Sequence, residues 1–232
     1  MRLLLINPNG SVHITRRMAD SAEAAILQGE RLTAITAEGH PAVVRCELTL
    51  QQANANALSM ARHHAAEHDA LLLAISLDDA VGALRRQHPD RVVVGMTEAA
   101  LMCAALQVER IGVLTLGRSM LPMYQRRVAE IGFGSRVVAI EAPEMPLAYT
   151  PQAAGQSAEV LQTLVQAGQR LADQGAEIIV LAGAVLCGYD RALALAVKMP
   201  VLDGITCGVD LARCMWTSRQ GHTLRMQRHQ PA

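Results

Sequence analysis

Short runs of apolar residues recur along this chain, and each run ends in a polar or glycine-containing turn. Runs of this length bounded by turn residues are typical of buried strands. The pattern predicts strands over residues 3–6, 32–36, 70–75, 91–95, 111–114, 136–140, 178–181 and 200–202.

Longer alanine- and leucine-rich stretches lie between these runs, and their apolar residues recur at helical spacing. Ser11 is expected to cap the first helix, whose inner face would carry Ile14, Met18 and Ala22. Thr97 is expected to cap a later one. The remaining helices are expected over 48–68, from 78 or 79 to near 86, from 97 to 106, from 119 to near 131, over 153–174, after 188 and over 205–215.

The second half of this pattern repeats the first, element by element. The offset stays close to ~107 residues, and a constant offset of this kind indicates an internal duplication. The matching positions are Leu3 with Ile111, Thr33 with Val137, Leu71 with Ile178, and Val92 with Val201.

The duplication predicts an α/β fold of two pseudo-twofold-related, doubly wound units, each a four-stranded parallel sheet. These tandem flavodoxin-like halves would enclose a cleft. We expect one unit to span 1–96 with 205–232 and the other to span 97–204, because the last helix is expected to pack back on the first half. In open parallel sheets ligands bind beyond the carboxyl ends of the strands, so the cleft there is the expected site.

Composition narrows the choice of partners. The chain is 51% hydrophobic but only 2% aromatic, and its formal net charge is +0 at pH 7. No basic stripe is present, so nucleic-acid binding is not expected. No apolar stretch is long enough to span a membrane. Five cysteines without a C-x-x-C spacing indicate reduced thiols rather than a disulfide framework or a zinc site, and we expect a cytoplasmic protein without a metal.

Two similar units place equivalent turns on opposite sides of a small ligand. That geometry suits removal of a proton from one face of a carbon atom and delivery to the other face, by two groups that exchange protons near neutral pH. Backbone N–H groups at helix starts near Ser11, Thr97 and Ser119 can hold an anionic or imide-like ligand.

The sequence resembles the Asp/Glu/hydantoin racemase superfamily, most closely its hydantoin and allantoin racemase branch. The opening Ile6–Ser11 is similar to that branch's Asn-Pro-Asn-Thr-Ser segment, and the other matches follow in the same order over nearly the whole chain. They are Asp78 with Ala83–Arg85, Gly95–Ala99, Val113–Ser119, Gly175–Leu181 and Pro200–Gly204. The resemblance implies cofactor-independent racemisation or isomerisation of a small carboxylate or a hydantoin-like ring amide. It also suggests a homo-oligomer.

The chain departs from this family at the two catalytic cysteines. Aligned without gaps, the first cysteine position falls on Ile75 and the second on Gly183, and neither residue can carry a proton. Ser76 and Cys187 are the remaining catalytic candidates, since Ser76 adjoins the first position and Cys187 lies four residues past the second. A helix start near Cys187 would lower the pKa of its thiol.

Asn9, Ser11, Thr97, Thr115 and Ser119 are the candidate substrate-binding residues, although turn and cap chemistry explains the same residue types. Two functions stay open. The chain is an enzyme with an altered catalytic pair, which includes one-face reactions such as a one-thiol decarboxylation. Alternatively, it is a catalytically silent relative that only binds a small ligand. A loop shift that brings Cys187 into the cleft is a third, weaker reading.

Overall fold

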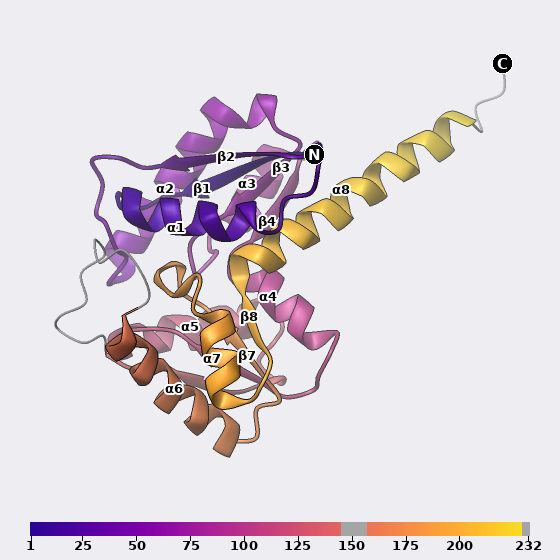
Figure 1. Ribbon diagram of the computed structural model, residues 1–232. Coiled ribbons are helices and arrows are strands. Elements are labelled where there is room, and N and C mark those ends of the chain that lie inside the picture. Colours follow the sequence, from indigo (N-terminus) through magenta and orange to yellow (C-terminus); the bar gives the residue numbers. More distant parts are fainter. Residues whose placement is uncertain (145–156, 229–232) are drawn as a thin grey trace.

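The computed structural model describes residues 1–144 and 157–228, with side chains as far as Gly221 in the last helix. Within these residues two all-parallel sheets stand one above the other (Figure 1). The first has the order β2-β1-β3-β4 and the second the order β6-β5-β7-β8. The strands are β1 (Arg2–Asn7), β2 (Arg31–Thr36), β3 (Ala70–Leu73), β4 (Val92–Gly95), β5 (Ile111–Leu114), β6 (Val137–Glu141), β7 (Ile178–Leu181) and β8 (Val201–Asp203).

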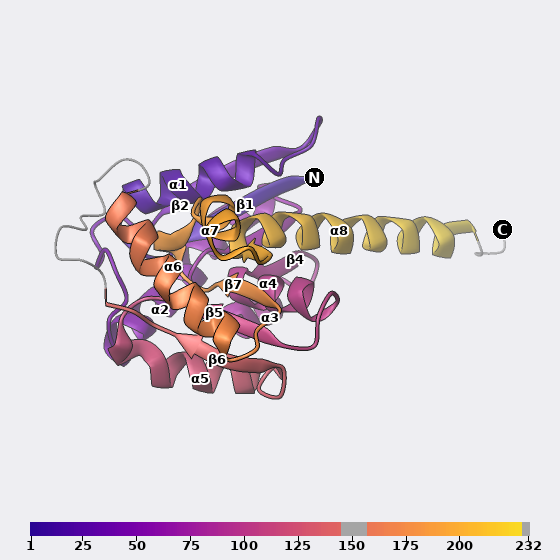
Figure 2. The same cartoon turned by 60° about the horizontal axis from the view of Figure 1, so that its bottom comes forward.

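Helices cover both faces of each sheet (Figure 2). They are α1 (Val12–Glu23), α2 (Glu47–His64), α3 (Val81–Gln87), α4 (Met96–Ala105), α5 (Leu121–Glu130), α6 (Ala158–Asp173), α7 (Asp190–Val197) and α8 (Gly204–Arg228). Short 3-10 turns add η1 (Ala65–Glu67), η2 (Arg118–Met120) and η3 (Ala184–Leu186). The predicted fold class, two similar four-stranded α/β halves, is confirmed.

The two sheets also repeat in register. Leu3 pairs with Ala70 as Ile111 pairs with Ile178. Leu71 pairs with Val93 as Ile179 pairs with Val201. The second member of each set follows the first at one constant spacing along the chain, as a duplicated unit requires.

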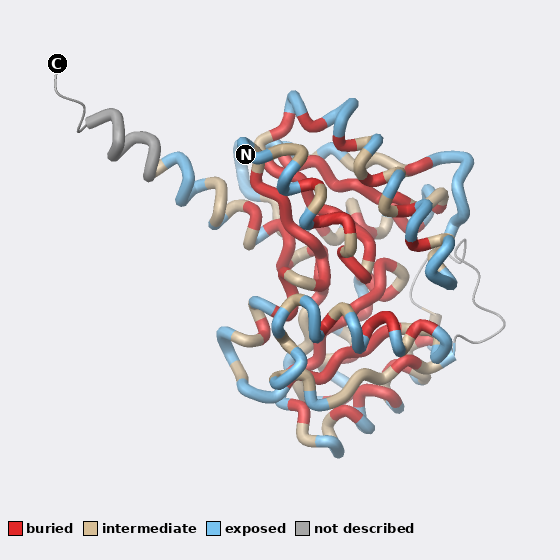
Figure 3. The backbone as a smooth tube through the Cα atoms, turned by 180° about the vertical axis from the view of Figure 1, so that it is seen from behind, coloured by how far each residue is buried: buried red, intermediate tan, exposed pale blue. Residues whose placement is uncertain are grey.

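The helices α4 and α8 join the halves into one core. Helix α4 leads from β4 to β5 and packs on α8 and β7, and α8 packs on β3, β4 and α1. One apolar cluster therefore runs from Leu4 through Leu101 to Val180 and Val209 (Figure 3). A second cluster lies beneath α6 and α7 and includes Leu164 and Leu193. The expected return of the last helix to the first half is confirmed, whereas the proposed domain boundaries stay a prediction.

Several expected boundaries are wrong, for local reasons. Helix α8 continues to Arg228 instead of ending at Met215, and its far end projects from the body (Figure 1). Residues 217–220 are exposed, so no inward-facing apolar pattern marked this extension. Thr97 is not a cap, because α4 begins one residue earlier with Gly95 as its N-cap. The expected helix start at 153 lies outside the described residues. No helix in the described part of the chain is long and apolar enough to cross a bilayer.

The close crossing of α4 and α8 generates a stability prediction. A Cβ atom on Gly204 would lie 2.6 Å from the backbone oxygen of Met96, which cannot swing aside. Gly204→Ala should therefore lower the free energy of unfolding by ~1–3 kcal/mol through overpacking. Urea denaturation of the purified variant measures this.

The matched control is Gly82→Ala in α3, where an added Cβ meets only the Arg86 side chain at 3.7 Å. That variant should be as stable as the wild type or gain up to ~1 kcal/mol from helix propensity. Equal effects of the two substitutions would contradict the close crossing.

Candidate functional site

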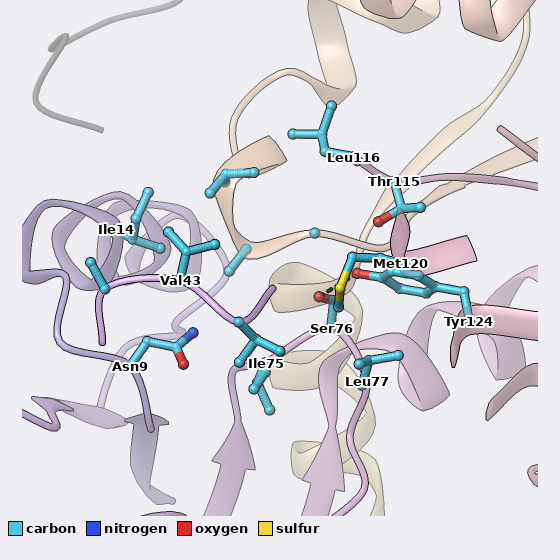
Figure 4. Close-up of a pocket in the computed structure, with 15 residues that line it drawn as sticks. Asn9, Ile14, Val43, Ile75, Ser76, Leu77, Thr115, Leu116, Met120 and Tyr124 are labelled. Atoms are coloured by element: carbon cyan, nitrogen blue, oxygen red, sulfur yellow. Dashed lines mark hydrogen bonds between the residues drawn. The ribbon is translucent and has the colours of Figure 1, made fainter. Parts of the chain in front are cut away.

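A pocket of about 90 Å³ lies where the two halves face each other at the carboxyl ends of their strands (Figure 4). Each half contributes the turns after its first and third strands. The lining residues are Asn9, Ile14, Ala42, Val43, Val44, Ile75, Ser76, Leu77, Thr115, Leu116, Met120, Tyr124, Gly183, Ala184 and Val185. The expected cleft is thus present, and Asn9 and Thr115 open onto the same hollow.

Both positions assigned to the family cysteines face this pocket. Ile75 follows β3 and Gly183 follows β7, and both belong to the lining. Gly183 leaves its place without a side chain, and a Cβ added there would meet the Leu186 side chain first, at 3.3 Å. The described lining contains no cysteine, histidine or carboxylate. Its polar atoms are hydroxyls, one amide side chain and backbone groups.

A hydroxyl pair stands at one end of the pocket. The phenol of Tyr124 donates a hydrogen bond of 2.6 Å to Ser76 Oγ (Figure 4). The neighbouring Ser76 and Thr115 hydroxyls both act to lower the pKa of this phenol. Burial outweighs them and raises the pKa of Tyr124, so at neutral pH the phenol keeps its proton and acts as a donor.

Tyr124 was not among the residues expected in the site. It lies on α5, in the second half, and is only 4% exposed. The sequence held one usable signal. The chain has only three tyrosines, so each of them is worth considering as a residue with a specific role. The contact between Ser76 and Tyr124 could not be predicted from the sequence, because the two residues lie far apart along the chain and in different halves.

The backbone of Ser76 is held by helix α4. Thr97 Oγ1 donates a 2.6 Å hydrogen bond to the Ser76 carbonyl oxygen. Thr97 is 1% exposed and lies behind the pocket rather than in its lining. It therefore positions Ser76, and the substrate contact expected of it stays an untested prediction.

Asp78 fixes the other end of the same turn. Its Oδ2 accepts a 2.7 Å hydrogen bond from the Glu98 N–H, so this carboxylate caps α4 from a distance in sequence. Asp78 has a φ of 55°, in the left-handed region, and Arg127 Nη2 donates to its carbonyl oxygen at 3.1 Å. Gly95 leaves room for the carboxylate, since a Cβ there would lie 2.5 Å from Asp78 Cγ. Full burial raises the pKa of Asp78 well above its usual range, against the hydrogen bond from Glu98.

The remaining predicted binding residues lie apart from the pocket. Ser11 caps α1, as expected, by accepting a 3.4 Å hydrogen bond from the Ile14 N–H. Ser119 is exposed within η2. Neither belongs to the described lining. Of the five candidates, the structure brings Asn9 and Thr115 to the pocket, and their contact with a ligand stays a prediction.

Cys187 is buried away from the pocket. Its sulfur lies 3.7 Å from Asp203 Oδ1 and borders a separate hollow with Arg17 and Asp190. The expected lowering of its pKa is wrong: burial and the nearby Asp203 carboxylate raise the pKa well above the usual thiol value. Helix α7 begins only at Asp190, so its N–H groups do not reach the sulfur as a cap. A catalytic role for Cys187 stays a prediction without geometric support.

The described residues contain no group of three or more histidine, cysteine or acidic side chains arranged to hold a metal ion. A catalytic role for Ser76 likewise stays a prediction. Its partners are now defined as the Tyr124 hydroxyl on its side chain and the Thr97 hydroxyl on its carbonyl.

Comparison with known proteins places these features in a family. The family model described as Asp/Glu/Hydantoin racemase matches residues 3–212. A hydantoin racemase of Paenarthrobacter aurescens is 27% identical over 93% of this chain and 91% of its own. An allantoin racemase from Klebsiella pneumoniae superposes with a TM-score of 0.82 at 21% identity, over 93% of this chain and 87% of its own. An unliganded arylmalonate decarboxylase superposes with a TM-score of 0.61 at 16% identity, over 93% and 92%.

The buried carboxyl of Asp78 predicts a pH-dependent stability. Its pKa is raised on folding, so the folded state binds the proton more tightly, and stability falls as pH rises from ~4 toward the raised value. Asp78→Asn keeps an oxygen that can accept from Glu98 but removes the ionisation. Relative to this variant, the wild type should lose stability across that window, as measured by thermal unfolding at several pH values. A difference between the two that is constant with pH would contradict the raised pKa.

Proposed function

Because the chain belongs to the Asp/Glu/hydantoin racemase family, we propose that it binds a small carboxylate or a hydantoin-like ring amide in the pocket between its halves. The observation that supports this most is the hydroxyl pair of Ser76 and Tyr124 at the pocket wall. Ring amides and carboxylates both carry oxygen atoms that accept hydrogen bonds from hydroxyl donors.

The hydroxyl groups are suited to an oxygen-rich ligand. The Tyr124 phenol stays protonated at neutral pH and can donate a hydrogen bond, and Thr115 also lies on the pocket wall. A ligand oxygen that replaces Ser76 Oγ as the acceptor of the phenol would keep every buried donor satisfied. Asn9 at the far end can meet a second polar group of the ligand.

The proposed activity does not include racemisation by two thiols. That route needs a proton carrier on each face of the substrate, and the alignment without gaps assigns the two family cysteine positions to Ile75 and Gly183, which carry no proton. A one-thiol decarboxylation would likewise need a thiol on the wall, and the described lining holds none. Ligand binding without two-face proton exchange is therefore our first proposal.

A second candidate is proton transfer on one face only, with Tyr124 as the acid. Its support is the 2.6 Å bond in which the Tyr124 phenol directs its proton to Ser76 Oγ on the pocket wall. In such a step the bond between the substrate carbon and its carboxylate would break and release carbon dioxide. The phenol would give its proton to the carbanion that is left and would regain a proton from solvent. Its raised pKa makes Tyr124 a weak acid near neutral pH, so we place this second.

The binding proposal predicts the effect of removing each hydroxyl. Tyr124→Phe should weaken binding of the best ligand in a panel of hydantoins, allantoin and amino acids, because it removes the donor of the proposed hydrogen bond. Ser76→Ala removes the acceptor that competes with the ligand and should not weaken binding. A hydrogen bond to a charged group contributes about 1.5–3 kcal/mol, so the affinity of Tyr124→Phe for a carboxylate ligand should fall about 10- to 100-fold. Isothermal titration calorimetry measures it. Ser119→Ala, an exposed hydroxyl of the same half as Tyr124, is the control and should bind like the wild type. Undiminished affinity in Tyr124→Phe would sink the proposal.

Solvent exchange separates binding from catalysis. Under the first proposal, NMR in D2O should show no enzyme-dependent incorporation of deuterium into a bound ligand. If exchange occurs, Tyr124→Phe should abolish it under the second candidate, while Cys187→Ala should leave it intact. The opposite pattern, with exchange lost in Cys187→Ala alone, would assign the chemistry to the buried thiol and contradict both.

A further inference from the structure

Two arginines reach across between the halves, one in each direction. Arg17 lies on α1, in the first half, and its Nη2 donates a 2.6 Å hydrogen bond to the carbonyl oxygen of Cys187, after β7. Arg127 lies on α5, in the second half, and its Nη2 donates to the carbonyl oxygen of Asp78, after β3, at 3.1 Å. Each contact joins the helix after the first strand of one half to the turn after the third strand of the other half. The two contacts are therefore counterparts in the duplicated fold.

Each of these helices also carries a pocket residue one turn before its arginine. Ile14 precedes Arg17 on α1, Tyr124 precedes Arg127 on α5, and both Ile14 and Tyr124 line the pocket (Figure 4). Residues three apart are neighbours on one face of a helix. The face that lines the pocket therefore also carries the arginine that bonds the opposite half.

The two turns that accept these bonds are continuous with the pocket wall. Residues 75–77 line the pocket just before Asp78, and residues 183–185 line it shortly before Cys187. Because the arginines hold these two carbonyl oxygens, they fix how far the walls of the two halves stand apart.

Both arginines are partly shielded from water and have a second contact. The Arg17 guanidinium carbon lies 5.4 Å from the centroid of the fully buried Tyr189 ring, which adds a cation–π attraction. The Arg127 side chain is 13% exposed, and its Nε lies 3.9 Å from Asp79 Oδ1. Partly buried charges are screened by salt much less than exposed ones, so these contacts keep their strength in solution.

A further ion pair between the halves is exposed. Arg126 and Glu47 approach to 3.4 Å, with about half of each side chain in solvent. Exposed pairs of this kind contribute little to stability. Release of Arg17 and Arg127 is therefore the step that decides whether the halves part.

The pocket is too closed to admit a ligand as it stands. Its volume of about 90 Å³ is well below the ~300–1,000 Å³ that is usual for small-molecule sites. Thr115 is 1% exposed and Tyr124 is 4% exposed, so solvent hardly reaches the groups that would meet a ligand. A ligand must therefore enter while the halves stand further apart, and the contacts between the halves must break for that.

We propose that Arg17 and Arg127 are a pair of latches that hold the pocket closed, and that a ligand enters and leaves only when both contacts with the opposite half break. The identity of the ligand rests on the proposed function, whereas the latches rest on contacts within the chain. A hydrogen bond from a charged donor favours the bonded state by about 10-fold or more. Loss of either latch should therefore raise the population of the open form by about that factor.

The opening can be measured without any ligand. Thr115→Cys places a thiol of similar size on the closed wall, in a full chain whose exposed Cys46 and Cys214 are replaced by serine. The folded protein is treated with iodoacetamide for increasing times, and peptide mass spectrometry gives the alkylation rate at each cysteine. Arg17→Ala and Arg127→Ala should each raise the rate at position 115 about 10-fold, because alkylation follows the population of the open form. The double variant should be alkylated faster still.

Arg16→Ala and Gln125→Ala are the matched controls, because both side chains are exposed on the same two helices. They should leave the rate at position 115 unchanged. Cys207 is buried in the apolar core away from the pocket wall, so its alkylation reports general unfolding and should be equally slow in every variant. The proposal is overturned if neither arginine variant is alkylated faster at position 115, or if the rate at Cys207 rises by the same factor.

Two conservative variants keep the test decisive if an alanine variant folds poorly. Arg17→Lys and Arg127→Lys retain a charged donor, so they should be alkylated at position 115 at rates between those of the wild type and the alanine variants. For any ligand of the panel that binds, stopped-flow mixing should show faster association and faster dissociation in Arg17→Ala and Arg127→Ala. Failure of every ligand to bind would count against the proposed function alone, because the alkylation rates require no ligand.

Discussion

The carboxyl group of Asp78 accepts the Glu98 N–H at the start of α4, and the shape of the pocket depends on this contact. The bond spans two strands of the first sheet, since Asp78 follows β3 and Glu98 follows β4. It holds Asp78 in the left-handed backbone region, where a non-glycine residue needs support from its surroundings. Thr97, the residue before Glu98, bonds the Ser76 carbonyl. The first turn of α4 thus sets the direction in which Ser76 presents its hydroxyl to Tyr124.

The second half achieves its equivalent turn differently, and the pocket is asymmetric as a result. By the register of the sheets, Leu186 takes the place of Asp78, and it is buried in an apolar cluster. Helix α8 is capped instead by Asp203, whose Oδ1 accepts from the Ile205 N–H at 2.9 Å. The wall after β7 therefore presents Gly183, Ala184 and Val185, without side-chain hydrogen-bonding groups. The two halves of the duplicated fold therefore line the pocket unequally, with its hydroxyl groups on one side.

Much of the fold was predictable from sequence, because each half is built from strong local signals. Apolar runs and turn residues located all eight strands to within about two residues, and helical spacing named the inner face of α1 correctly. The failures came where distant residues decide. Thr97 has the residue type of a cap, but the N-cap of α4 is Gly95, and the side chain that accepts from its first turn belongs to Asp78, in the turn after β3. The end of α8 was also placed too early, because its sequence has no inward-facing apolar pattern where the helix projects from the body.

The site was less predictable than the fold for the same reason. Sequence reasoning placed Asn9, Thr115, Ile75 and Gly183 at strand ends, and all of them line the pocket. It missed Tyr124, because a helix residue acquires its partner only when the two halves close together. It expected an activated thiol at Cys187 from nearness to a helix start, and burial against Asp203 reversed the pKa shift. The sequence predicts which residues lie at strand ends. The burial of each side chain, and therefore its pKa, follows only from the packing of distant parts of the chain.

The satisfied hydroxyl pair also limits what the pocket can do under the proposed function. In the free protein Tyr124 already has an acceptor in Ser76 Oγ, so an incoming ligand exchanges one hydrogen bond for another. Such exchange yields about 1 kcal/mol for neutral partners and more for charged ones. Selectivity should therefore favour ligands whose oxygen atoms carry negative charge over neutral ring amides of the same size. The apolar remainder of the wall, from Ile14 to Val185, then supplies the affinity that the hydrogen bonds do not.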